Sequence, residues 1–183
     1  MMARALLLRP KLIVADEPVS MVDASLRATI LAGLQRLNQD FGISIIYITH
    51  DLTTAYHLSE NLIVLYRGAV VEAGSVELVV GDPHHPYTRL LIGSIPLPDP
   101  DRPWQREQLP VEAPTLALDP RRRCAFADRC PVAMARCWES APPLYRTHSH
   151  RAAACFLYQD AEPLAADQMT SVFVSNGRRN GGP

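Results

Sequence analysis

Residues 12–18 have the sequence Leu-Ile-Val-Ala-Asp-Glu-Pro, an apolar run that ends in two carboxylates and a proline. Four apolar residues without alternation predict a strand buried on both faces, as in a parallel sheet covered by helices. Two adjacent acids do not fit inside such a strand, so Asp16 and Glu17 should lie at its C-terminal edge. Pro18 supports this, because it lacks the backbone N–H that a residue in a central strand would donate. Open α/β folds bind ligands at this edge. One carboxylate there can hold Mg²⁺, and the next can deprotonate an attacking water. Taken alone, the stretch also fits an acidic surface turn.

A helix and a second buried strand follow. An amphipathic helix over about 24–40 is predicted by apolar residues at helical spacing, namely Leu26, Ile30, Leu34, Leu37 and Phe41. Gly42 suits the left-handed position after its end. Residues 43–48 are apolar and β-branched, which predicts a strand. If the crossover is right-handed and the strands are parallel, the end of this strand brings His50 to the same edge as Glu17.

Residues 19–25, Val-Ser-Met-Val-Asp-Ala-Ser, and 48–52, Ile-Thr-His-Asp-Leu, complete a set of three motifs. Together they resemble the ATP-binding subunits of ABC transporters. The resemblance implies a Walker B strand that ends in Asp16, which supports Mg-ATP, and in the catalytic Glu17. It implies a D-loop with Ser20 and Asp23 that couples two subunits. His50 takes the place of the switch histidine, which contacts the γ-phosphate.

The fold implied is α/β: part of the parallel sheet of a P-loop NTPase with flanking helices, plus a small cysteine-containing C-terminal lobe. A phosphate-binding loop of the Gly-x-x-x-x-Gly-Lys-Ser/Thr type is absent, because Lys11 is the only lysine and has no glycine nearby. The Leu-Ser-Gly-Gly signature is absent as well. The resemblance therefore covers about residues 1–158 and begins just after that signature, and we expect no ATP hydrolysis by this chain alone.

The composition changes at residue 82. Residues 83–88, Pro-His-His-Pro-Tyr-Thr, match a phrase typical of the dipeptide and oligopeptide branch of these ATPases. We expect His84 and His85, beside prolines in a linker, to be exposed to solvent. Seven prolines lie in residues 96–120, which predicts an extended connector. The expected organisation is an ATPase part, a proline-rich connector, a cysteine-rich segment and a flexible tail, with bounds 1–82, 83–120, 121–158 and 159–183.

The chain has four cysteines, Cys124, Cys130, Cys137 and Cys155, and no secretion signal. In a reducing compartment metal ligation is favoured over disulfides. Nearby arginines should lower the pKa of the thiols and favour thiolates. Four thiolates can hold zinc or a [4Fe–4S] cluster. Since no Cys-x2–4-Cys knuckle is present, we favour the cluster, which the resembled branch carries in some members, over zinc and over four reduced thiols.

The net charge of −1 gives no attraction to nucleic acid, and no run of 18 apolar residues is present. The resemblance implies a subunit of a dipeptide or oligopeptide importer that couples ATP hydrolysis to uptake. Its partners are a second ATPase subunit, transmembrane permease subunits and, indirectly, a peptide-binding protein. Its location is cytoplasmic, at the inner face of the cell membrane. The alternative is a non-enzymatic iron–sulfur or zinc-binding interaction module that retains a relic ATPase half.

Overall fold

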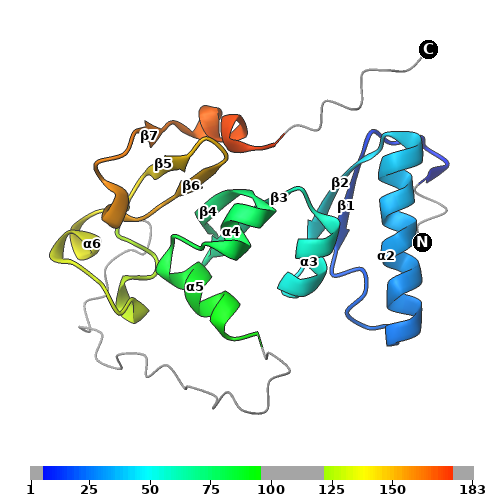
Figure 1. The fold of residues 1–183 in the computed structure, drawn as a ribbon, viewed down its shortest axis with the longest axis horizontal. Helices are drawn as coiled ribbons and strands as arrows, with labels where there is room; N and C mark the ends of the chain where they lie inside the picture. Colours follow the sequence, from blue (N-terminus) through cyan, green and yellow to red (C-terminus); the bar gives the residue numbers. More distant parts are fainter. Residues whose placement is uncertain (1–5, 96–121, 175–183) are drawn as a thin grey trace. The chain divides into compact units, whose positions relative to one another are not determined.

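The computed structural model describes residues 6–95 and 122–174, which divide into two compact units (Figure 1). The first unit ends at Ser59, and the second comprises Glu60–Val174. Within the described ranges, no helix is long and apolar enough to cross a membrane. The bounds at 82, 120 and 158 that the composition suggests remain a prediction, and most of the proline-rich connector lies outside the described residues.

Among the residues that the structure describes, the first unit is built on a parallel pair of strands. Strand β1 (Leu12–Asp16) pairs in parallel with β2 (Ser44–Ile48), and α2 (Ala24–Phe41) connects them. Helix α3 (Leu52–Leu58) follows β2. Gly42 ends α2 with a φ of 65°, as the sequence predicts. The predicted strand, helix and strand are therefore confirmed.

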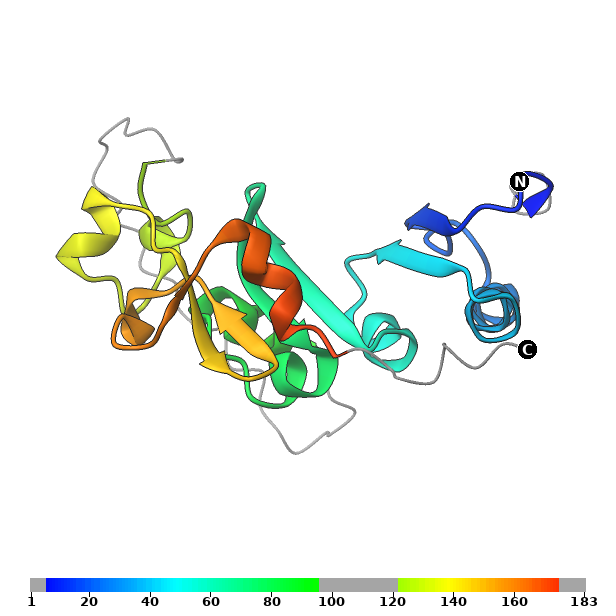
Figure 2. The same cartoon turned by 90° about the horizontal axis from the view of Figure 1, so that it is seen from above.

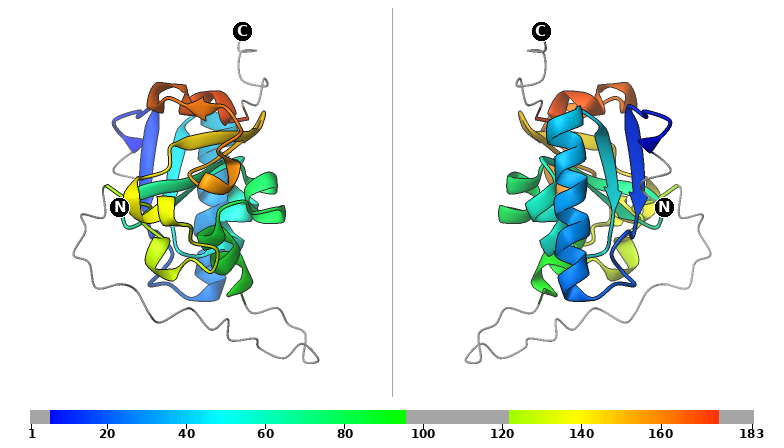
Figure 3. Two further views of the ribbon diagram at one scale, coloured as in Figure 1. Left: turned by 90° about the vertical axis from the view of Figure 1, so that its left-hand side faces the viewer. Right: turned by 90° about the vertical axis from the view of Figure 1, so that its right-hand side faces the viewer.

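The expectation that β1 is buried on both faces is wrong for the described residues. Helix α2 covers one face of the strand pair (Figure 3). On the other face, Val14 of β1 is 59% exposed and Ile46 of β2 is 50% exposed. No described element covers this face, so the uninterrupted apolar run has a half-exposed pattern instead of a buried one.

The second unit is built on one antiparallel sheet of order β3-β4-β6-β5-β7 (Figure 2). Strands β3 (Asn61–Tyr66) and β4 (Ala69–Ser75) form a hairpin. Helices α4 (Val76–Gly81) and α5 (Pro86–Gly93) follow β4. The core joins residues from both sides of the undescribed segment, Val64, Tyr66, Val71, Val79 and Phe126.

The C-terminal part begins with a 3-10 turn, Ala127–Arg129, and α6 (Ala135–Glu139). The remaining elements are β5 (Leu144–His148), β6 (Arg151–Ala153), a turn at Phe156–Tyr158, β7 (Pro163–Leu164) and a 3-10 helix, Ala166–Val172. Because β6 pairs with β4, these strands continue the sheet of the second unit. A separate cysteine-containing lobe is therefore not confirmed.

The tail expected from residue 159 onward is ordered as far as Val174. Leu164 and Val172 are buried and pack with Ala152 of β6. Asn61 also exchanges two hydrogen bonds with the backbone of Val174, at 2.8 and 2.9 Å. The prediction of a flexible tail is wrong for 159–174, because two widely spaced apolar side chains are enough to attach this polar segment to the sheet.

Candidate functional site

The carboxyl ends of β1 and β2 bring Glu17 and His50 together. The parallel register places Asp16 opposite Ile48, so both strands end at the same edge. The Glu17 N–H donates to the Ile48 carbonyl at 3.0 Å, which extends the pairing by one residue. His50 Nδ1 then lies 2.7 Å from Glu17 Oε1, and the His50 backbone N–H donates to the same oxygen at 3.1 Å. The predicted convergence of these two side chains is present.

Glu17 has a strained backbone. Its φ is 45°, in the left-handed region that residues with a Cβ seldom occupy. The turn that follows is held by Ser20, whose N–H and hydroxyl both donate to the Glu17 carbonyl, at 3.2 and 3.0 Å. This turn directs the Glu17 side chain across to His50. Strain of this kind is found at sites where geometry matters for function.

The other side chains predicted for this site lie around the same edge. Asp16 is the exposed last residue of β1, and Ser20 is in the turn after it. Asp23 is the N-cap residue of α2, where its carbonyl accepts from the Arg27 N–H at 2.8 Å. Its side chain makes no capping hydrogen bond, so its carboxylate is not used by the helix that it precedes.

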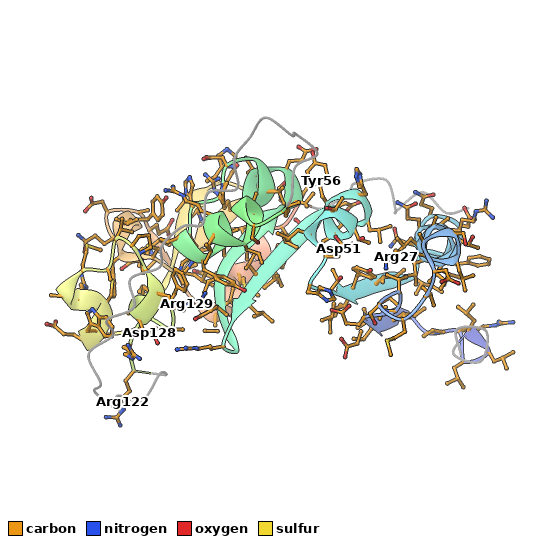
Figure 4. The ribbon with its side chains drawn as sticks, turned by 90° about the horizontal axis from the view of Figure 1, so that it is seen from below. Arg27, Asp51, Tyr56, Arg122, Asp128 and Arg129 are labelled. Atoms are coloured by element: carbon orange, nitrogen blue, oxygen red, sulfur yellow. The ribbon has the colours of Figure 1, made fainter. Side chains whose placement is uncertain are left out.

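Asp51 directly follows His50 at the end of the second strand. Its carboxylate begins α3 by accepting hydrogen bonds from the N–H groups of Thr53 and Thr54 and from the Thr54 hydroxyl, the last at 2.6 Å. The Thr54 hydrogen bond is the main cause that lowers the Asp51 pKa, and Arg27 adds to it. Arg27 comes from α2 and Asp51 from the start of α3 (Figure 4). The sequence signal is an aspartate two and three residues before threonines at a helix start.

The carboxylates fit magnesium in the way that nucleotide sites use it. Mg²⁺ is usually held by one or two carboxylates, with water and phosphate oxygens completing its octahedron. Asp16 and Glu17 offer two carboxylates at one strand edge. Among the described residues no group of three or more His, Cys, Asp or Glu could hold a metal by itself. The edge therefore has the donors for a metal that arrives with phosphate.

The four cysteines belong to the second unit and lie near one another. The Cys124 N–H donates to the Cys137 carbonyl at 2.9 Å, and all four side chains are free thiols. Burial raises the pKa of Cys124 and of Cys130, and it raises that of Cys155 to about 11. Neighbouring thiols raise these values further. Both effects disfavour the thiolate form of a cysteine that is not bound to a metal.

The expectation that arginines lower these pKa values is wrong. The Arg123 guanidinium lies over the Trp138 ring, 4.9 Å from its centroid, and Arg136 lies 4.6 Å from the Phe156 centroid. Their charges are directed at aromatic faces and, for Arg123, at Asp128, 3.8 Å away. Among the described residues no group of three or more His, Cys, Asp or Glu could hold a metal ion, so an iron–sulfur cluster or zinc at the cysteines is not supported.

The two histidines of the Pro-His-His-Pro phrase are not exposed to solvent, contrary to the expectation. His85 is 1% exposed, and the His84 side chain is 17% exposed. His84 stacks on Tyr158, with ring centroids 4.6 Å apart. His84 contacts Arg151 and Tyr158, more than 60 positions later, and the His85 ring lies 5.9 Å from the Phe126 ring, so local composition gave no sign of this packing.

Residues 71–137 match the protein-family model described as "Oligopeptide/dipeptide transporter, C-terminal region". This range begins in β4 and includes His84, His85 and the first three cysteines.

The curated relatives of this chain include oligopeptide transport ATP-binding proteins. The chain is 40% identical over 161 residues to the putative oligopeptide transport ATP-binding protein YkfD of Bacillus subtilis, covering 87% of this chain and 49% of the relative. It is 41% identical over 150 residues to the oligopeptide transport ATP-binding protein OppF of Escherichia coli, covering 81% and 45%. The chain thus spans about half the length of the curated relatives that it matches.

Among solved structures, the chain is similar to MJ1267, an ATP-binding cassette of an ABC transporter in its ADP conformation. The identity is 28%, and the match covers 49% of this chain and 36% of that one, with a TM-score of 0.42. The resemblance inferred from the motifs is confirmed by the sequence relatives.

Proposed function

Because this chain is a relative of the ATP-binding subunits of oligopeptide ABC transporters, we propose that it forms the hydrolytic edge of such a subunit and serves uptake of dipeptides or oligopeptides. The observation that carries the proposal is the contact of 2.7 Å between Glu17 and His50, at the shared carboxyl edge of two parallel strands. An acidic surface turn does not require a strained backbone or a histidine from the neighbouring strand.

In this proposal Glu17 is the general base that polarises the attacking water. A carboxylate can only accept, so the Nδ1 atom of His50 carries the hydrogen that joins the two side chains. This bond fixes the His50 ring, which is 82% exposed on its side chain, and leaves Nε2 to contact the γ-phosphate. Preorganised groups of this kind supply most of the catalysis in phosphoryl transfer.

The remaining residues of the edge bind Mg-ATP, shape the turn after Glu17 and couple this subunit to a second one. Asp16 supports the Mg²⁺ of Mg-ATP, whose charge neutralises the phosphates when it is bound. Ser20 shapes the turn after Glu17, and Asp23 couples to a second ATPase subunit. Its carboxylate makes no capping bond in α2, which supports this role.

The subunit would work at the inner face of the cell membrane with partners of the transporter. These are a second ATPase subunit, transmembrane permease subunits and, indirectly, a peptide-binding protein. Nucleic acid is not a partner, in keeping with the net charge of −1. The alternative of a metal-binding interaction module is not supported, since no group of three or more metal-ligating side chains is found among the described residues and the relatives are ATP-binding proteins.

Peptide uptake tests the proposal. The part of E. coli OppF that precedes its match to this chain would be fused to residue 1, and the chimera expressed in cells that lack OppF. Uptake of a labelled tripeptide should return, and Glu17→Gln in the same chimera should abolish it. A chimera that assembles at the membrane but gives equal uptake with and without Glu17 would contradict the assigned role.

A further inference from the structure

A buried polar cluster joins the segment after β4 to strand β6. Glu72 of β4 is fully buried, and its two carboxylate oxygens accept the backbone N–H groups of His84 and His85, each at 2.9 Å. Arg151 of β6 is 4% exposed and donates to the carbonyls of Leu78 and Asp82. Strand β6 is therefore attached to the helical segment by side chains as well as by its pairing with β4.

His85 serves this cluster only while its ring is neutral. It is the N-cap residue of α5, and its Nδ1 accepts the backbone N–H of Tyr87 at 3.1 Å. A protonated imidazole has two donors and no acceptor, so protonation removes this cap. The ring is also buried against Phe126, with centroids 5.9 Å apart, where a charge would lose its hydration.

His84 has the same requirement. Its Nε2 lies 2.6 Å from Nη2 of Arg151, and a guanidinium can only donate. The nitrogen must therefore present its lone pair to Arg151. A proton on Nε2 would place two donors and two positive charges against each other at this contact.

Charged and polar groups from several neighbouring segments surround the His84 and His85 rings. Asp82 Oδ2 lies 3.3 Å from both His84 Nε2 and Arg151 Nη1, and the Tyr158 hydroxyl donates to the His84 carbonyl. Arg89 of α5 donates to the Pro83 carbonyl, and its charge disfavours a proton on His84. Asp82 favours that proton, but it is already engaged by Arg151. Glu72 faces the backbone N–H groups of both histidines.

We propose that His84 and His85 form a proton-sensitive contact, in which protonation of either ring releases residues 82–88 from the part of the second unit that carries Phe126, against His85, and Arg151 of β6, against His84. The hairpin of β3 and β4 stays folded, while the cysteine-bearing part of the second unit loosens. This inference rests on the second unit alone and is independent of the proposed function.

The electrostatics agree with the geometry. Burial lowers the pKa of His85 from 6.5 to about 4, and burial followed by the Arg151 charge lowers the pKa of His84. A lowered histidine pKa stabilises the closed form above pH 6.5, and this contribution is lost as the pH falls from about 6.5 to 4. Burial raises the pKa of Glu72, so protonation of Glu72 on acidification acts in the opposite sense.

Hydrogen exchange of the full chain tests the proposal. The opening equilibrium of β6, from exchange rates corrected for intrinsic chemistry, would be measured at pH 7.5 and pH 5.5. A shift of the His85 pKa from 6.5 to about 4 predicts that opening rises about tenfold between these values. In the double variant His84→Gln/His85→Asn the rise should be less than about twofold, because asparagine keeps the N-cap acceptor without titrating.

His57→Asn is the matched control, since His57 is exposed on α3 of the first unit and should leave the rise unchanged. An equal rise in wild type and double variant would overturn the proposal. If the double variant does not fold, the His85 ring is titrated by NMR in the wild-type chain instead. A pKa below 5.5 is expected, and one near 6.5 would overturn the proposal.

Discussion

Asp23 and Asp51 both precede helices of the first unit, but they use their side chains differently. Asp51 accepts hydrogen bonds from two backbone N–H groups and from the Thr54 hydroxyl. Asp23 makes no side-chain cap. An N-cap is replaceable only at a cost in stability, whereas an uncapped carboxylate is available for a partner. The Asp51 carboxylate therefore supports its helix, whereas the Asp23 carboxylate is left available for the role proposed for it.

This difference gives a residue-scale prediction. Asp51→Ala should lower the free energy of unfolding by about 0.5–2 kcal/mol through loss of the cap. Asp23→Ala is the matched control and should change the unfolding free energy by less than about 0.5 kcal/mol. Urea unfolding monitored by circular dichroism compares the two variants. Equal losses would show that Asp23 also supports its helix.

The pairing of Glu17 with His50 could be predicted because the ends of parallel strands coincide, and each residue lies two positions after the end of an apolar run. The burial of His85 could not, because it depends on Glu72 and Phe126, which lie on other elements. The same holds for the thiols. The nearby arginines suggested thiolates, but the guanidinium groups of Arg123 and Arg136 lie over aromatic rings.

At the scale of elements, Gly74 permits the pairing of β4 with β6. Its φ is 150°, and a Cβ there would overlap the carbonyl oxygen of His150 and lie 2.7 Å from Cα of Arg151. The backbone of β6 therefore approaches β4 at a distance that a side chain would prevent.

Gly74→Ala should therefore destabilise the second unit, by about 1–3 kcal/mol from overpacking alone. Gly81→Ala, where nothing lies within 4 Å of an added Cβ, is the control and should not destabilise the chain. Thermal unfolding and exchange of the β6 amides would both report the change. Unaltered β6 protection in Gly74→Ala would mean that the strand adjusts its position.

The predicted elements of the first unit have strong periodic or β-branched patterns, and their bounds agree with the structure to within a few residues. The pattern did not show that β1 has one exposed face, because exposure depends on which elements are present to cover it. The order in 159–174 was missed because β7 is only two residues long and is held mainly by distant contacts.

At the scale of the whole molecule, the chain has the edge proposed for hydrolysis, but its sequence contains no Gly-x-x-x-x-Gly-Lys-Ser/Thr motif. Backbone N–H groups and the lysine of a loop with this motif make most contacts to the nucleotide phosphates. Calorimetry of the isolated chain with Mg-ATP should therefore show no measurable binding. Micromolar affinity would mean that another part of the chain binds phosphate.

The central claim is that Glu17 acts as the base for ATP hydrolysis, and turnover by the purified chimera with the N-terminal part of OppF tests it most directly. Glu17→Gln keeps the shape of the side chain and its acceptor for His50 but removes the base. Turnover should fall by about 10²–10⁴-fold while Mg-ATP binding is retained, and Asp40→Asn, at an exposed position of α2, should have no effect. Turnover of Glu17→Gln equal to that of the unsubstituted chimera would contradict the claim and leave Glu17 as a turn residue.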